Sequence, residues 1–247
     1  MRAEGGLPGG DDGAAPTVGD EVDEDREVDE DREVDEDREV GVGPWPGSWP
    51  KGAGYDPELL EHGDRRNVVD RYRYWRLDAI VADLDARRHP FHVAIENWSH
   101  DMNIGSVVRT ANAFLAAEVH IIGRRRWNRR GAMVTDRYQH LRHHPTVEDF
   151  AEWAAAAGPG GAGLPVIGID NVPGSVPLEG YPLPRECVLV FGQERVGLSD
   201  AVRAVARDTL SIAQFGSTRS INAGAAAAIA MHSWIEQHAE PRVRPQE

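Results

Sequence analysis

The sequence contains a single cysteine, Cys187, so no disulfide can form within the chain and no zinc or iron–sulfur site can use several cysteine ligands. It also lacks any run of about 18 apolar residues, the length that a membrane-spanning helix needs. The N-terminal residues do not combine a basic segment with an apolar one, as a secretion signal does. From these absences we expect a soluble, cytoplasmic protein without a membrane segment.

The formal charge of −14 is distributed unevenly along the 247 residues. Residues 1–40 hold 17 of the 41 acidic residues and 4 of the 27 basic ones, which leaves the rest of the chain nearly neutral. Within this segment the sequence Glu-Val-Asp-Glu-Asp-Arg occurs three times, beginning at Glu21, Glu27 and Glu33. Its few apolar side chains cannot offset the entropy lost on ordering, so we expect a disordered acidic tail.

Changes in composition divide the chain into three parts. Residues 1–54 are predicted to be the disordered acidic tail with a Gly/Pro/Trp-rich linker, residues 55–90 an arginine-rich helical extension, and residues 91–247 one α/β domain. In the extension, one helix is predicted over Asp64–Arg88, because its apolar residues are consistent with a single stripe.

Beyond Pro90, short apolar runs alternate with helical stretches, a pattern typical of a parallel sheet with helices on both faces. The predicted strands are Phe91–Ile95, Val119–Ile122, Pro165–Ile169, Val188–Phe191 and Leu210–Ile212. The predicted helices are Ile104–Ala116, Val147–Ala157, Leu198–Ala206 and Ser220–His238.

Two patterns resemble binding motifs without the context that their chemistry needs. Residues 158–163 match the dinucleotide pattern G-x-G-x-x-G, yet they follow a helix and precede a strand, the reverse of the Rossmann order. His140, His143 and His144 have spacings that share a helix face, but no carboxylate or cysteine accompanies them in a metal-binding spacing. We predict a flexible loop for the first, a solvated or RNA-facing cluster for the second, and no bound metal.

Basic residues gather immediately after the predicted strand Val119–Ile122, around Trp127. Ligands bind at the carboxyl ends of parallel strands, and arginine beside an aromatic ring suits phosphate and an unstacked base. A solvated basic loop is the alternative. The pattern favours RNA binding by five arginines, Arg124, Arg125, Arg126, Arg129 and Arg130.

Three further segments occur in a distinctive order. In Asn103–Phe114, Asn103 suits a helix N-cap and Arg109 lies about two turns further on. Val188–Ser199 leads a buried strand into Gly192-x-Glu194-x-x-Gly197. Ile212–Asn222 ends in Ser220-Ile221-Asn222, just before a helix of small residues. Each segment alone is compatible with ordinary turns and caps.

Together these segments resemble the three motifs of the SpoU-type (TrmH-like) RNA 2′-O-ribose methyltransferases of the SPOUT superfamily, over roughly Phe91 to His238. The resemblance implies an α/β fold with a C-terminal trefoil knot, S-adenosyl-L-methionine as cofactor, tRNA or rRNA as substrate, and a homodimer. It implies cofactor contacts at Gly192, Ile212 and Ile221, and catalytic or near-catalytic roles for Asn103, Arg109, Glu194, Ser220 and Asn222. Gly192 would let the main chain approach the ligand closely, because it has no Cβ.

The implied reaction is methyl transfer to a ribose 2′-hydroxyl. A guanidinium stays protonated in proteins, so we expect Arg109 to clamp the adjacent phosphate and orient the hydroxyl instead of acting as a general base. One alternative is an RNA-binding protein on an inactive methyltransferase scaffold. A base methyltransferase is a further alternative, which the ribose-type motif Ser220-Ile221-Asn222 disfavours. Ala213-Gln214 departs from the proline and methionine that are common in the family, so we expect altered packing around the cofactor.

Overall fold

The computed structural model describes residues 41–98, 103–194 and 196–240, which belong to one compact unit, Val40–Glu247. The predicted acidic tail lies outside these residues. Among the described helices, none has the length and apolar character required to cross a membrane.

A seven-stranded sheet in the order β3-β2-β1-β6-β4-β7-β5 forms the centre of the fold. Every pairing in it is parallel, and the central strands are apolar because helices cover both of their faces. The strands are β1 (Phe91–Asn97), β2 (Val119–Gly123), β3 (Leu141–His144), β4 (Val166–Ile169), β5 (Val176–Pro177), β6 (Cys187–Phe191) and β7 (Asp208–Ser211).

The five predicted strands are confirmed, while the two edge strands, β3 and β5, were not predicted. β3 reads Leu-Arg-His-His, and β5 has two residues, Val176 and Pro177. Edge strands need neither length nor a continuous apolar run, because only one side pairs with a neighbour. Neither segment therefore carries the apolar pattern on which strand prediction depends.

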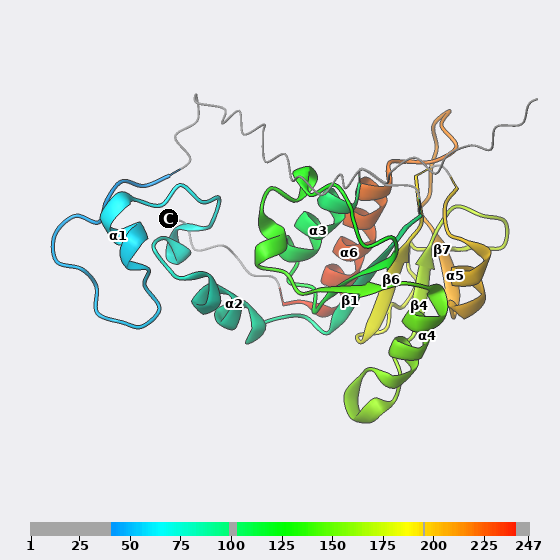
Figure 1. The fold of residues 1–247 in the computed structure, drawn as a ribbon. Coiled ribbons are helices and arrows are strands. Elements are labelled where there is room, and N and C mark those ends of the chain that lie inside the picture. The colour runs from blue at the N-terminus through cyan, green and yellow to red at the C-terminus, as the bar shows by residue number, and fades with distance from the viewer. Residues whose placement is uncertain (1–40, 99–102, 195, 241–247) are drawn as a thin grey trace, which may run out of the picture. The chain divides into compact units, whose positions relative to one another are not determined.

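Six α-helices surround and precede the sheet: α1 (Pro57–His62), α2 (Leu77–Asp85), α3 (Ile104–Ala113), α4 (Val147–Ala156), α5 (Asp200–Val205) and α6 (Ala223–His238), counted over the described residues. Alternate residues of β1 face opposite sides. Phe91, Val93 and Ile95 pack into one core cluster with residues of α3 and α6, and Ala94 packs into a second with residues of α4 and α5. Figure 1 shows α3 and α6 side by side, apart from α4 and α5. The predicted helices of the α/β domain and their placement on both faces are confirmed.

The long helix predicted over Asp64–Arg88 is wrong. A 3₁₀ turn at Asp70–Tyr72 is followed by Tyr74, whose φ of 62° is left-handed, and α2 begins only at Leu77. The buried Asp64 carboxylate explains the break, because it accepts hydrogen bonds from the Tyr74 amide at 2.9 Å and from the Arg66 guanidinium at 2.9 and 2.7 Å. A side chain that binds main-chain amides in this way offers the backbone an alternative to a helix.

The residues expected to form a linker are also held in place. The amide of Val42 donates to the carbonyl of Asp64 at 2.9 Å, and the amide of Trp45 donates to the carbonyl of Leu60 at 2.8 Å. The Tyr74 hydroxyl donates to the carbonyl of Gly43 at 2.6 Å. Residues 41–54 therefore pack against the extension, and the three-part division of the chain stays a prediction.

Candidate active site

The carboxyl ends of β1, β4, β6 and β7 lie at one edge of the sheet, because all these strands run parallel. A cavity of about 260 Å³ opens at this edge. Its walls include all three residues predicted to contact a cofactor, Gly192, Ile212 and Ile221, together with Glu194 and Ser220 from the predicted catalytic set.

The side chain of Asn222 connects the three motifs beside this cavity. Its Nδ2 donates to Oδ1 of Asn103 at 2.8 Å and to Oε1 of Glu194 at 3.3 Å. Its Oδ1 accepts from the amides of Gly224 and Ala225 and so caps α6. The two amide donors require an oxygen on that side, which fixes the nitrogen toward Asn103 and Glu194.

Asn103 occupies the N-cap position of α3 as predicted, but its side chain makes no capping hydrogen bond. Its Oδ1 instead accepts the hydrogen bond from Asn222, 119 positions further along the chain. The side chain therefore joins α3 to the start of α6, which explains the asparagine better than a capping role does.

Arg109 is exposed on α3 and, unlike Asn103, has no described contact with the Asn222 side chain. It follows Ser106 by three residues, so both lie on the same side of the helix. Ser106 faces α6, since a Cβ added at Gly224 would lie 3.3 Å from the Ser106 Cβ. The guanidinium is thus presented on the α6 side of α3 and remains open to solvent, as does the hydroxyl of Ser220.

The fold gives a further reason for the glycine at position 192, and its predicted contact with a cofactor stays a prediction. A Cβ at this position would lie 2.0 Å from the carbonyl carbon of Gly197 and 2.2 Å from the amide nitrogen of Leu198. Gln193 and Gly197 exchange two main-chain hydrogen bonds, of 3.1 and 2.8 Å, and this turn closes the chain over Gly192. Close approach of the chain to itself therefore requires the glycine.

Two carboxylates outside the three motifs hold the same loop. Oδ2 of Asp170, just beyond β4, accepts from the amide of Leu198 at 2.8 Å. Oε2 of the buried Glu96, in β1, accepts from the amide of Ser199 at 2.8 Å. Neither residue was predicted to act at the site. An acidic residue at the end of an otherwise apolar strand is the signal that could have identified both.

Two glutamine side chains give the cavity its polar character. Oε1 of Gln193 and Oε1 of Gln214 are buried and have no hydrogen-bond partner among the described residues, and both residues line the cavity. Ile169, Phe191 and Ile221 supply apolar walls. A buried acceptor without a donor costs free energy, so the cavity suits a ligand that combines an apolar ring with N–H groups.

Hydrogen bonds from Asn97, in β1, hold the backbone of the basic loop that follows β2. Nδ2 of Asn97 donates to the carbonyls of Arg124 and Arg126 at 2.7 and 2.8 Å, and the ring of Trp127 packs against the core. All five arginines predicted to bind RNA are exposed. The loop thus presents its charged side chains to solvent on a backbone that the sheet holds in place.

Six arginines of the N-terminal extension form local ion pairs with aspartates, so their charge is largely compensated. The pairs are Arg66–Asp64, Arg71–Asp83, Arg73–Asp70, Arg76–Asp78, Arg87–Asp83 and Arg88–Asp85. In the loop after β2, Arg129 also pairs, with Asp136 at 3.6 Å.

The predicted histidine cluster is not on a helix. His143 and His144 are neighbours in β3, so their side chains point to opposite faces of the sheet. His144 is buried, which contradicts a solvated or RNA-facing role for it, whereas Nε2 of His140 lies 2.8 Å from the carboxylate of Asp85.

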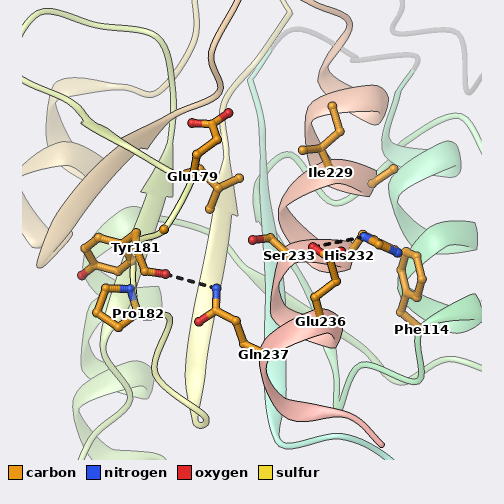
Figure 2. Close-up of a pocket in the computed structure, with 12 residues that line it drawn as sticks. Phe114, Glu179, Tyr181, Pro182, Ile229, His232, Ser233, Glu236 and Gln237 are labelled. Atoms are coloured by element: carbon orange, nitrogen blue, oxygen red, sulfur yellow. Dashed lines mark hydrogen bonds and ion pairs between the residues drawn. The ribbon is translucent and has the colours of Figure 1, made fainter. Parts of the chain in front are cut away.

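A larger hollow, of about 860 Å³, lies between α6 and residues 178–182. Figure 2 shows Ile229, His232 and Glu236 along one side of it and Tyr181 and Pro182 on the other. None of the residues predicted to act in catalysis, cofactor binding or RNA binding lines this hollow. The smaller cavity at the carboxyl edge is therefore the candidate active site.

The SpoU rRNA Methylase family model matches residues 90–232. The chain belongs to this family. The match covers the sheet, the cavity and most of α6, and it confirms the resemblance drawn from the three motifs. The extension before residue 90 lies outside it.

The SpoU-family chain is 25% identical to a tRNA (guanosine(18)-2′-O)-methyltransferase of Escherichia coli K12 over 158 residues, 62% of this chain and 67% of that protein. It is 30% identical over 187 residues to an uncharacterized tRNA/rRNA methyltransferase of Mycolicibacterium smegmatis, 70% of this chain and 56% of that one. The chain thus spans between just over half and about two thirds of these relatives.

Solved structures of SpoU proteins share the fold. AviRb from Streptomyces viridochromogenes, in complex with AdoMet, gives a TM-score of 0.55 at 24% identity over 65% of this chain and 62% of that one. The A. aeolicus TrmH/SpoU tRNA modifying enzyme gives a TM-score of 0.56 at 20% identity over 66% and 82% of the two chains.

Proposed function

We propose that this chain transfers a methyl group from S-adenosyl-L-methionine to a ribose 2′-hydroxyl of a structured tRNA or rRNA. The observation that carries the proposal is the side chain of Asn222, which hydrogen-bonds Asn103 and Glu194 beside the cavity. Three motifs from distant parts of the chain meet there. Relatives named as tRNA 2′-O- and tRNA/rRNA methyltransferases support the class of substrate.

The cavity fits the cofactor that an AdoMet-bound neighbour contains. Its apolar walls suit an adenine ring. The side-chain oxygens of Gln193 and Gln214, which have no partner within the part of the chain that the structure describes, suit the amino groups of such a ligand. Gly192, Ile212 and Ile221 would contact it mostly through backbone groups. When bound, S-adenosyl-L-methionine supplies the sulfonium methyl group.

Arg109 is proposed to bind the phosphate next to the target ribose. Its guanidinium is exposed and stays protonated, and it can form two parallel hydrogen bonds with phosphate oxygens. Fixing the phosphate orients the 2′-hydroxyl, a poor nucleophile that gains most from accurate placement. Asn103, Glu194 and Asn222 hold the surrounding loops, and Ser220 offers a hydroxyl at the cavity wall.

The proposed reaction is tested by calorimetry with S-adenosyl-L-methionine and by transfer of a tritiated methyl group to total RNA. We expect cofactor binding and labelled ribose 2′-O-methyl groups, whose positions then identify the RNA. The absence of binding heat from well-folded protein would contradict the proposal. RNA binding without methyl transfer would favour the alternative of an inactive scaffold, and label on a base would favour a base methyltransferase.

The loop arginines are expected to bind the RNA backbone. Replacing Arg124 and Arg125 together by alanine should weaken RNA binding about equally for different sequences, because phosphate contacts carry no sequence information. The slope of log affinity against log salt concentration should fall by about one for each phosphate that the variant no longer binds. Arg203→Ala, at an exposed position on α5, is the matched control and should leave the slope unchanged. An unchanged slope in the double variant would indicate a merely solvated loop.

The homodimer and the trefoil knot that the resemblance implies stay predictions. The exposed side of α6, which includes Ile229, is the described surface that we expect a second copy to cover. A cytoplasmic location, where tRNA and rRNA occur, is part of the same proposal.

A further inference from the structure

Three histidines lie side by side on neighbouring strands, on the face of the sheet that α4 covers. Nδ1 of His92, in β1, lies 3.1 Å from Nε2 of His120, in β2. Nδ1 of His120 lies 2.9 Å from Nε2 of His144, in β3. Trp153 of α4 covers the row, with its ring centroid 3.9 Å from that of His120. None of these residues lines the candidate active site.

A carboxylate completes a possible donor set at the amino-terminal ends of the strands. Glu118 immediately precedes β2, and its Oε2 lies 3.7 Å from Nε2 of His120. One ligand atom from each of His92, Glu118 and His120 lies within 4.8 Å of the others. The opposite edge of the sheet carries the cavity, so the two locations are separate.

The spacing of these atoms matches a tetrahedral metal site. Zinc binds imidazole nitrogen and carboxylate oxygen at about 2.0–2.2 Å, which places neighbouring ligand atoms of a tetrahedron about 3.4 Å apart. The separations of 3.1 and 3.7 Å lie on either side of that value. The third pair, His92 and Glu118, lies within 4.8 Å, so side-chain adjustments would be needed to bring the three atoms around one ion.

His144 can set the orientation of the central ring. If Nδ1–H of His120 donates to Nε2 of His144, then Nε2 of His120 keeps its lone pair and directs it toward His92 and Glu118. Metal-binding histidines commonly have such a partner on the other ring nitrogen. His144 is thus a positioning residue and contributes no ligand atom.

Arg142 opposes an ion at this location. Its Nε donates to both carboxylate oxygens of Glu118, at 3.1 Å each, and its guanidinium lies 5.9 Å from the ring centroid of Trp153. The positive charge compensates Glu118 when no ion is present and would weaken the binding of a second cation. Removing the charge of Arg142 should therefore increase the affinity for a metal ion.

We propose that His92, Glu118 and His120 bind a divalent transition-metal ion, with zinc the best match to two imidazoles and one carboxylate. Such a site leaves a fourth position for water, since the side chain of Glu118 is partly exposed. The ion would tie β1 to β2 and act on stability, because the site lies away from the cavity. These are not the histidines considered from sequence spacing, of which only His144 takes part.

The test uses the full, untagged chain after treatment with a chelator. Zinc is titrated by calorimetry and cobalt(II) by its visible absorption, and the unfolding temperature is measured with and without zinc. We expect one ion per chain, a tetrahedral-type cobalt spectrum and a higher unfolding temperature with zinc. Absence of zinc binding by the folded wild-type chain would overturn the proposal.

Four variants and one control separate this site from adventitious binding. Glu118→Gln and His92→Gln should each weaken zinc binding at least about tenfold, and His144→Gln by about 10–100-fold. Arg142→Gln should tighten it, because the competing charge is gone. His62→Gln, at an exposed position on α1, should leave affinity unchanged. Equal affinities in the wild type, Glu118→Gln and His92→Gln would overturn the proposal, even if zinc binds elsewhere.

Discussion

Arg109→Ala is expected to lower the rate of methyl transfer by at least about 100-fold, the usual consequence of losing accurate placement of a reacting group. The side chain is exposed on α3 and is not among those that line the cavity, so its removal should leave cofactor affinity nearly intact. Tritiated methyl transfer measures the rate, and calorimetry with S-adenosyl-L-methionine measures the affinity.

Two further variants sharpen this experiment. Arg109→Lys keeps the charge but lacks the planar pair of donors, so it should recover only a small part of the activity. Arg185→Ala, at another exposed position, is the control and should transfer methyl groups at the wild-type rate. A wild-type rate in Arg109→Ala, or a loss of cofactor binding, would contradict the phosphate-clamp role.

Gly192→Ala is expected to disrupt the turn between Gln193 and Gly197, which forms part of the cavity wall. Its added Cβ would meet main-chain atoms of Gly197 and Leu198 at 2.0–2.2 Å, and backbone cannot rotate aside as the end of a side chain can. Overpacking costs about 1–3 kcal/mol in typical cores, and approaches this short place the loss of unfolding free energy at or above the upper end. We expect cofactor affinity to fall at least tenfold, because the same turn forms part of the cavity wall.

The matched control for this change is Gly216→Ala. Gly216 lies in the loop between β7 and α6, and a Cβ there would meet nothing within 4 Å. Chemical denaturation compares the free energies of unfolding, and calorimetry compares the cofactor affinities. If Gly192→Ala behaved like Gly216→Ala, the turn between Gln193 and Gly197 would be less rigid than its two main-chain hydrogen bonds indicate.

The elements predicted correctly are those whose local sequence reflects burial. β6 is an apolar run, and the first five residues of β1 are apolar apart from His92, because both faces of these strands are covered. That pattern is visible without any partner. The helix predicted over Asp64–Arg88 does not form, because a hydrogen bond between distant residues replaces it. Asp64 binds the amide of Tyr74, ten residues away, and no periodicity shows that bond.

The residues of the candidate site also fall into two groups, those that the sequence could identify and those that only the fold reveals. The three motifs could be identified along the chain, together with Gly192, Asn103 and Asn222. Their joint hydrogen bonding, and the support that Asp170 and Glu96 give to the amides of Leu198 and Ser199, became visible only in the fold. Motif residues occur in a recognisable order, whereas their partners are single residues in unrelated segments.

The sequence by itself determined the α/β class, the central strands, the family and the position of the basic loop, because burial, turns and short motifs leave local patterns. Tertiary structure alone decided which distant side chains meet. His92, His120 and His144 are 28 and 24 positions apart, and they become neighbours only because β1, β2 and β3 are adjacent in the sheet. Strand order and register determine such contacts, and strands that are buried on both faces lack the alternation of apolar and polar residues that would indicate their register.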